Sequence, residues 1–376
     1  IDYIKAIGIP YQYFISYNKE AQAIQYLEDV KSLLEQYKLD LAIVDTSRYN
    51  KELVKRRRLE QKFIFRKAID LVKEEEADVL FIAGDLFEDK FVEDDTITYV
   101  ISCLKEIKNT KVYITPGNHD PLIKSSPYNT FEWPENVFIF GSEVGMDSFE
   151  NINVYGIGFD DFEMDTTAVK DIEILKEDEE KINILITHAN LDGAAHKYHD
   201  VKTQWLQKFD YVALGHIHMP KIDDSRIIYP GSLIAGGFDE TGEHGLVVGE
   251  ITKENLNLNF VKMDETQFEV KEIDISKYMS PNEILDKLNL KDNIYKIVLT
   301  GIKNIDVNTL KEMILISGKY VCEIEDKTRM DYDLENIAMQ KTLKGVFTKK
   351  MLEEIKNNPE KEEQINRAIE YVYNNM

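Results

Sequence analysis

Cysteines and long apolar runs are nearly absent from this sequence. Its 376 residues include two cysteines, Cys103 and Cys322, which lie far apart along the chain. A disulfide framework and a cysteine-based zinc site are therefore excluded. No apolar run is long enough to span a bilayer, and no signal-peptide pattern is found. These absences predict a reduced, cytoplasmic protein that has no membrane partner.

Basic residues are also in short supply, with 46 Lys and Arg against 69 Asp and Glu and a formal net charge of −23. An acidic chain of this kind repels nucleic acid, so a polyanionic substrate would have to be met by metal ions or by a local basic patch. The one dense basic run contains Arg56, Arg57 and Arg58. On charge alone this run is a solvated helix face, and it is also the candidate nucleic-acid contact.

Histidine is scarce and unevenly placed. None of the seven histidines precedes His119, and none follows His244. Four of them lie in turns that follow apolar runs, whereas His196, His199 and His244 are individually more typical of structural histidines. Four imidazoles at glycine-flanked strand ends indicate a shared site more strongly than any one of them does alone.

The apolar run from Val79 to Asp85 is the clearest strand in the sequence. A fully apolar run of this length between a helical pattern and a turn is typical of a buried parallel strand. Such a strand delivers its last residue to the carboxyl edge of the sheet, where open α/β folds place their chemistry. A buried Asp85 is costly there unless it holds a cation or a proton. The same pattern of strand, turn and polar residue recurs at Asn118-His119, His188 and His216-Ile217-His218.

The order of strands and helices predicts an α/β fold, a two-sheet αββα sandwich with a smaller C-terminal α+β domain and a helical tail. We expect four parts, namely an N-terminal segment over 1–44, the sandwich over 45–262, the small domain over 263–333 and the tail over 334–376. The third part has no histidine, and the tail is charged and helical, as a partner-binding surface would be.

The residue types at the strand ends indicate a metal. Carboxylate, amide oxygen and imidazole without thiolate suit Mn²⁺, Fe or Zn²⁺ better than a structural zinc or an all-oxygen calcium site.

Four motifs, in this order and spacing, resemble those of the calcineurin-like metallophosphoesterases: Gly84-Asp85, Gly117-Asn118-His119-Asp120, Thr187-His188 and Gly215-His216-Ile217-His218. Others resemble the SbcD-type DNA-repair exonucleases, especially their YhaO-like branch: Ile82 to Phe87, Tyr229 to Ser232, Gly237 to Glu240 and Gly242 to Gly245. The motifs cover about residues 50 to 250, and the tail, with Asp326 to Arg329 and Thr342 to Gly345, is also similar to that branch.

The resemblance implies a two-metal site bridged by Asp85, in which one metal position is completed by Asn118, His188 and His216. The other position takes His218 and an Asp-x-His at the end of the first strand. This sequence departs from the family there, because the first histidine is missing. Two placements are open for that motif, Asp45-Thr46-Ser47 with serine for histidine, or Gln36-Tyr37-Lys38.

The implied chemistry is metal-dependent hydrolysis of phosphodiesters, in which His119, oriented by Asp120, protonates the leaving oxygen. The implied cofactor is a divalent metal, Mn²⁺ for preference, as one or two ions. The implied partners are DNA and an SbcC-like coiled-coil ATPase, and a homodimer is a further expectation. Two rival hypotheses follow from other features: a catalytically impaired DNA-binding or scaffold subunit, because of the missing motif, and a small-molecule phosphoesterase, in which the run from Arg56 to Arg58 has no role.

Overall fold

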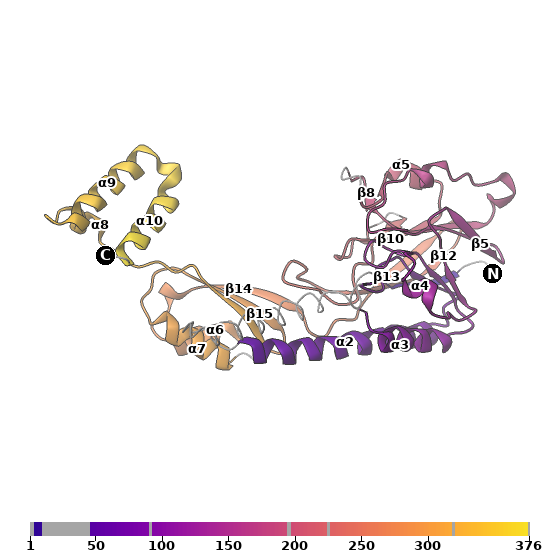
Figure 1. Cartoon of the computed structure of the whole chain (residues 1–376), viewed down its shortest axis with the longest axis horizontal. Helices are drawn as coiled ribbons and strands as arrows, with labels where there is room; N and C mark the ends of the chain where they lie inside the picture. The colour runs from indigo at the N-terminus through magenta and orange to yellow at the C-terminus, as the bar shows by residue number, and fades with distance from the viewer. Residues whose placement is uncertain are drawn as a thin grey trace. The chain divides into compact units, whose positions relative to one another are not determined.

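We describe the fold from a computed structural model of the chain, which describes residues 4–9, 46–89, 92–193, 197–223, 226–317 and 320–374 (Figure 1). The chain divides into two compact units, residues 1–268 and 269–376. The predicted boundary at residue 262 coincides with the last residue of a strand in the first unit, β13 (Leu256–Lys262). Each unit is described by itself below.

The larger sheet of the first unit has six strands in the order β13-β12-β1-β2-β3-β4. Beyond β13, these are β12 (Gly245–Ile251), β1 (Ile4–Ile9), β2 (Val79–Ile82), β3 (Lys111–Ile114) and β4 (Val137–Ile139). β1 pairs with β2 in parallel and with β12 in the antiparallel sense. The sheet of the sandwich therefore includes residues 4–9, whereas the sequence predicts a domain that begins at residue 45.

The second sheet has five strands in the order β11-β10-β7-β6-β5. They are β5 (Gly145–Phe149), β6 (Ile152–Ile157), β7 (Ile182–His188), β10 (Tyr211–Gly215) and β11 (Ile227–Ile228). β6, β7 and β10 run parallel to one another. A short ladder joins β8 (Asn190–Leu191) to β9 (Asp200–Val201).

Alternation along β2 shows how the two sheets are layered. Val79 and Phe81 belong to the apolar core between the sheets, whereas Leu80 and Ile82 belong to the core beneath the helices. That helical layer consists of α2 (Thr46–Glu74), which lies alongside α3 (Asp94–Lys105) (Figure 1). A third core covers the outer face of the second sheet, where residues of η1 (Ala168–Asp171) and α5 (Thr203–Leu206) pack. The predicted αββα sandwich is confirmed.

The remaining short elements of the first unit are α4 (Pro127–Thr130) and η2 (Lys176–Asp178). The sequence also predicts a helix from Ala21 to Tyr37 and a buried strand from Leu41 to Asp45, and both ranges lie outside the described residues.

The second unit is built on a three-stranded sheet in the order β14-β15-β16. These are β14 (Phe268–Asp274), β15 (Ile294–Thr300) and β16 (Val321–Asp326), and β15 pairs with β16 in parallel. A core between the sheet and two helices contains Ile284 and Leu310. The helical elements are η3 (Ile275–Lys277), α6 (Pro281–Leu288), α7 (Val307–Ser317), α8 (Leu334–Ala338), α9 (Leu343–Asn357), η4 (Pro359–Lys361) and α10 (Glu362–Asn374).

None of the helices in the described ranges combines the length and the apolar character that crossing a membrane requires.

Candidate functional site

Two pairs of parallel strands, β2 with β3 and β7 with β10, bring polar side chains to one end of the sandwich. β2 is followed by Asp85, β3 by Asn118, β7 ends at His188, and β10 is followed by His216. Asp85 and His216 both have a positive φ, of 53° and 95°. A left-handed conformation is rare for residues with a side chain and costs on the order of 1–3 kcal/mol. The fold therefore holds these two residues in strained turns, which is typical of functional positions.

Asp85, Asn118 and His188 meet at the centre of this end. His188 Nε2 lies 3.0 Å from Asn118 Oδ1 and 3.3 Å from Asp85 Oδ2. His188 Nδ1 lies 3.0 Å from the carbonyl oxygen of Ala83. Because a carbonyl oxygen can only accept a hydrogen bond, Nδ1 carries the ring proton and Nε2 presents its lone pair to the two oxygens. Three acceptor atoms therefore converge, and they need a cation or a proton between them.

Burial makes the charge of Asp85 costly. The side chain is fully buried, and Oδ1 accepts a hydrogen bond of 2.7 Å from the backbone N–H of His119. Oδ2 has no hydrogen-bond partner among the described residues. Loss of solvation raises the pKa of Asp85 well above its usual value, and the carboxylates of Asp120 and Glu88 raise it further. Without a cation this carboxyl group therefore binds a proton more readily than an ordinary aspartate does.

Two glycines leave the space that His188 occupies. A Cβ atom on Gly84 would lie 2.5 Å from His188 Nδ1, and one on Gly215 would lie 1.7 Å from the carbonyl oxygen of Ala83. Gly84 also has a positive φ, of 88°. The glycines of the motifs are therefore required by close packing around the imidazole ring.

His216 lies next to His188, with ring centroids 5.2 Å apart in an edge-to-face arrangement. Its Nδ1 is buried and has no hydrogen-bond partner in the part of the chain that the structure describes. Burial, together with the imidazoles of His218 and His119, lowers the pKa of His216 to about 4. The ring is therefore neutral at physiological pH and has a lone pair for a ligand. The ring of Tyr198 covers it at 5.2 Å.

The donor set fits a divalent cation. Ligand atoms about 2.1 Å from one octahedral ion are about 3 Å apart along an edge, which is close to the two separations measured from His188 Nε2. Counting only His, Cys, Asp and Glu, no group of three in the described ranges is close enough to hold an ion. The group here includes an amide oxygen, and His216 would have to approach by a side-chain movement. Oxygen and imidazole ligands suit Mn²⁺, Fe or Zn²⁺.

His119 is half-buried beside this group, and its Nδ1 lies 2.9 Å from Glu88 Oε2. The sequence predicts that Asp120 is catalytic and orients His119, and the structure corrects this role. Asp120 is fully buried, and its carboxylate accepts hydrogen bonds from the backbone N–H groups of Asp85, Phe87 and Gly117 and from Tyr128 Oη. Asp120 therefore fixes the two loops that carry Asp85 and Asn118, and Glu88 is the carboxylate that orients His119.

The pKa of Asp120 also shows the effect of burial. Loss of solvation raises it to about 6, although hydrogen bonds from Tyr128 and three backbone amides act in the opposite direction. The hydroxyl of Tyr128 donates to Asp120 Oδ2 at 2.6 Å, and burial raises the pKa of Tyr128 well above its usual value.

His218 forms a second imidazole–carboxylate pair, between its Nδ1 and Glu240 Oε1. Glu240 is largely buried and also accepts a hydrogen bond of 2.6 Å from the backbone N–H of Gly236. Burial alone would raise the pKa of Glu240, but His218 and the Gly236 amide lower it below its usual value.

Sequence reasoning missed Glu88 and Glu240 as functional residues. Glu88 directly follows the motif from Ile82 to Phe87, and Glu240 is the last residue of the motif from Gly237 to Glu240. Their spacing does not reveal which imidazole each one meets. His199 and His244 are both fully buried, and His196 lies outside the described residues.

The basic run does not act as one surface, and the prediction that Arg57 contacts nucleic acid is wrong. The Arg57 side chain is fully buried, and it donates to Glu60 at 2.8 Å and to the carbonyl oxygen of Ala235 at 2.7 Å. Arg56 is partly buried and donates to Thr266 Oγ1. Arg58 is exposed, with Glu93 3.9 Å away. Of these three arginines, only Arg58 and part of Arg56 can face a polyanion.

The missing motif stays unplaced. Asp45 and Gln36 to Lys38 lie outside the described residues, whereas Thr46 and Ser47 begin α2. The first strand of the larger sheet is β1, which pairs directly with β2. The sequence that follows β1, Pro10-Tyr11-Gln12, contains neither a carboxylate nor an imidazole.

Comparison with known proteins shows what this part of the chain is similar to. A chain of Bacillus subtilis (strain 168) described as "Uncharacterized metallophosphoesterase YhaO" is 26% identical over 233 residues, 56% of this chain and 55% of the relative. The chain thus spans about half the length of that curated relative. The crystal structure of TT1561 of Thermus thermophilus is similar with a TM-score of 0.34 and 14% identity, over 54% of this chain and 95% of the other.

The family comparison agrees with the residues that meet at the strand ends. Residues 57–220, which contain Asp85, Asn118, His119, His188 and His216, match the profile of the family described as calcineurin-like phosphoesterase. This family uses divalent metals. Residues 57–220 are therefore similar to a calcineurin-like metallophosphoesterase domain.

Proposed function

We propose that this protein hydrolyses phosphodiester bonds with a divalent metal, as a DNA exonuclease in DNA repair. One observation carries the hydrolytic part. The Nε2 lone pair of His188 faces Asn118 Oδ1 and Asp85 Oδ2, which has no hydrogen-bond partner among the described residues. A divalent cation stabilises such an arrangement of acceptors. The family match supports metal-dependent phosphoester hydrolysis.

The site residues of this chain have different proposed roles in metal binding and proton transfer. Asp85, Asn118, His188 and His216 would hold one ion, and His218 would contribute to a second position. A bound ion would supply a Lewis acid for the phosphate oxygens and a water of lowered pKa. Glu88 holds Nδ1 of His119, so that the Nε2 edge of this ring would donate a proton to the leaving oxygen. Asp120 keeps the loops of Asp85 and Asn118 together during the reaction.

DNA as the substrate is supported by the resemblance of the motifs to SbcD-type exonucleases. The charge of the chain opposes DNA binding, so the bound metal would supply most of the attraction to the phosphates, with Arg58 as a proposed basic contact.

An SbcC-like coiled-coil ATPase is the proposed partner. In the second unit, the side chains of Met339, Leu343 and Val346 are exposed where α9 begins. Leu343 and Val346 are one turn apart, a spacing that suits contact with another helix. Self-association also stays a prediction.

A nuclease assay tests the proposed function. Full-length protein with Mn²⁺ is expected to degrade linear duplex or single-stranded DNA from its ends, and His119→Ala is expected to abolish cleavage. Bis(p-nitrophenyl) phosphate serves as a small phosphodiester in parallel. Cleavage of this compound without cleavage of DNA would contradict the DNA proposal and favour a small-molecule phosphoesterase. Loss of both activities would favour a non-catalytic subunit.

A catalytically impaired DNA-binding or scaffold subunit is the second candidate function. The observation that favours it is the sequence after β1, which lacks the Asp-x-His that the second metal position needs. Metal analysis separates the two candidates. One ion per chain without turnover favours the scaffold, and two ions with turnover favour the enzyme.

A further inference from the structure

Two imidazole rings at the candidate site are each held by a buried carboxylate. Glu88 holds Nδ1 of His119, the proposed acid. Glu240 holds Nδ1 of His218, although it lies 22 residues away in the sequence. The Glu240 side chain is 12% exposed and that of His218 is 20% exposed. A carboxylate buried so deeply against one ring has a strong influence on that ring.

The contact fixes which nitrogen of His218 has the lone pair. A carboxylate that is ionised can only accept, and its second oxygen already accepts the N–H of Gly236. Nδ1 of His218 must therefore carry a proton, and in the neutral ring Nε2 carries the lone pair. A histidine that binds a metal usually donates its other ring N–H to a carboxylate in this way.

The loop that carries Glu240 is closed by its own hydrogen bonds. His244 Nε2 lies 2.9 Å from the carbonyl oxygen of Glu240, and His244 Nδ1 lies 2.7 Å from Ser232 Oγ. The backbone N–H of Ser232 in turn donates to the carbonyl oxygen of His218 at 2.7 Å. Hydrogen bonds therefore connect His218 to Glu240, Glu240 to His244, His244 to Ser232 and Ser232 back to His218. This closed set of contacts fixes the positions of both the carboxylate and the imidazole ring.

Arg57 ties this loop to α2. Its guanidinium group donates to the carbonyl oxygen of Ala235, next to the Gly236 whose N–H binds Glu240. It also lies over the ring of Phe268, 5.3 Å from its centroid. The buried arginine thus anchors one end of the loop, and His244 anchors the other.

We propose that Glu240 is a positioning residue, which holds His218 with its Nε2 lone pair directed to a divalent metal. The inference rests on the proposed metal-dependent function and deepens it, since it makes metal binding through His218 depend on the loop from Ser232 to His244. It also gives a role to three residues that are not themselves proposed metal ligands, namely Glu240, His244 and Arg57.

Mn²⁺ binding to the metal-free full chain, measured by isothermal titration calorimetry, tests this proposal. Glu240→Ala is expected to weaken Mn²⁺ binding by roughly 10- to 100-fold, the usual effect of removing the residue that orients a metal ligand. Glu240→Gln keeps one acceptor oxygen, which can hold His218 or Gly236 but not both, so its effect is expected to be smaller. Glu243→Gln is the matched control, because Glu243 is on the same loop and pairs on the surface with Lys262. This control is expected to bind as the wild type does.

A double-mutant cycle shows whether Glu240 acts through His218. Once His218→Ala has removed the ring, adding Glu240→Ala is expected to weaken Mn²⁺ binding no further. An equal loss from Glu240→Ala with and without His218 would overturn the proposal. Unchanged binding in His218→Ala or in Glu240→Ala would overturn it as well.

The ring proton gives a readout that needs neither metal nor DNA. In protein labelled with ¹⁵N-histidine, at a pH where imidazoles are neutral, His218 is expected to be protonated at Nδ1. His218→Gln assigns the signal among the seven histidines. Glu240→Ala is expected to move the proton toward Nε2 without unfolding the chain, as thermal unfolding checks. An Nε2-protonated ring in the wild type would overturn the proposal.

These measurements remain separate from the nuclease assay. Failure of DNA cleavage with intact coupling between Glu240 and His218 would contradict only the proposed activity. Intact cleavage without the coupling would contradict only the positioning role.

Discussion

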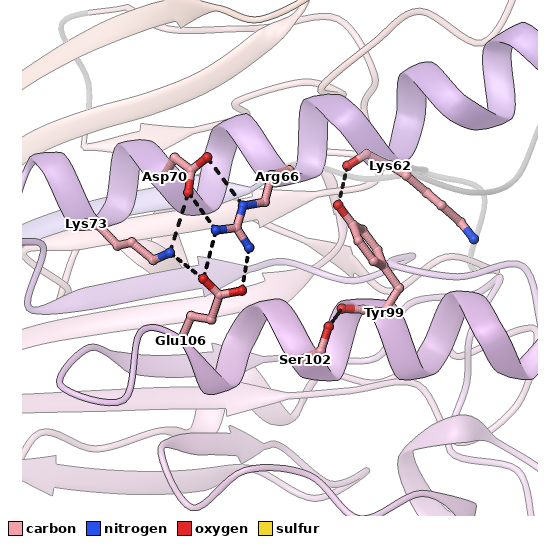
Figure 2. Close-up of polar contacts among 7 residues, drawn as sticks. All are labelled: Lys62, Arg66, Asp70, Lys73, Tyr99, Ser102 and Glu106. Carbon is pink, nitrogen blue, oxygen red and sulfur yellow. Dashed lines mark hydrogen bonds and ion pairs between the residues drawn. The ribbon is translucent and has the colours of Figure 1, made fainter.

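Two polar networks of the first unit are built from similar side chains, but they shift the pKa values of their carboxyl groups in opposite directions. Between α2 and α3, Arg66 contacts both carboxylate oxygens of Glu106, and Lys73 lies 2.6 Å from the same carboxylate (Figure 2). Arg66 also lies 3.1 Å from Asp70. At the strand ends, Asp85 instead lies near Asp120 and Glu88, and its Oδ2 lacks a hydrogen-bond partner among the described residues.

The two networks shift carboxyl pKa values in opposite directions. Hydrogen bonds from Arg66 and Lys73 lower the pKa of Glu106 to about 2. Burial raises the pKa of Asp85 well above its usual value and that of Asp120 to about 6. In the helix network, the charged groups of Arg66 and Lys73 therefore balance the carboxylates. The strand-end network has too little positive charge to balance its carboxylates. This difference is what separates a structural ion-pair cluster from a site that recruits a metal.

The substitution with the largest expected effect on this difference is Asp85→Asn. Removing the charge is expected to abolish measurable Mn²⁺ binding, a loss of more than about 100-fold, because the carboxylate is the proposed bridge between ions. The metal-free variant is expected to unfold at a higher temperature than the wild type, because a neutral amide is less costly to bury. Calorimetry and thermal unfolding measure the two effects. A metal-free Asp85→Asn that is less stable would show that the carboxylate is satisfied without a cation.

The buried Arg57 adds a third case to the comparison, namely a charged side chain that has partners but no contact with solvent. Arg57→Met leaves Glu60 and the carbonyl oxygen of Ala235 without their donor, so we expect a loss of about 3 kcal/mol in the free energy of unfolding. Arg58→Met, at an exposed neighbouring position, is the control and is expected to change stability by less than about 0.5 kcal/mol. Urea unfolding measures both. Equal effects would contradict the structural role of Arg57.

Changing the pH is expected to affect the strand-end network in a defined direction. Because the folded-state pKa of Asp120 is raised to about 6 and that of Asp85 is also raised, the folded protein binds more protons than the unfolded chain above about pH 4. The metal-free protein should therefore become less stable as the pH rises through 6, and Mn²⁺ binding should tighten by up to about tenfold per pH unit. Thermal unfolding with and without Mn²⁺ checks both signs. Metal affinity that does not change with pH would contradict the raised pKa values.

The smallest expected effect is that of Glu106→Gln in the helix network. These side chains are partly exposed, so the loss of stability at pH 7 is expected to stay below about 1 kcal/mol and to shrink with added salt. Because the pKa of Glu106 is lowered, its contribution is present above pH 4.5 and disappears as the pH falls toward 2. Urea unfolding at several pH values measures this. A large effect at high salt would show that the network acts as a buried one.

Much of the candidate site could be predicted from the sequence, because its residues lie directly after apolar strands. Asp85, Asn118 and His188 follow or end such runs, and parallel strands place their carboxyl ends together. Glu240 could not be assigned in this way, because it lies in a loop and meets His218 only through the fold. Arg57 was misassigned, because its acceptors at Ala235 and Thr266 lie 178 and 209 residues away.

The position of β1 shows another limit of sequence patterns. Residues 4–9 are apolar enough to form a strand, but nothing near them indicates that they pair with residues 79–82 and with residues 247–251. Asp120 shows the same limit on a smaller scale. Its place in the Gly117 to Asp120 motif suggested contact with His119, whereas the turn directs it to three backbone amides and a tyrosine.

The central place of β1 also bears on how the chain tolerates shortening. Loss of a strand at the margin of a sheet leaves one new edge, whereas loss of β1 would leave both β2 and β12 with open rows of amides and carbonyls. Such edges pair readily with other chains. A version that starts after Ile9 is therefore expected to precipitate or to oligomerise through these edges, and a fusion placed ahead of Ile4 would need a flexible spacer to leave the strand free to insert.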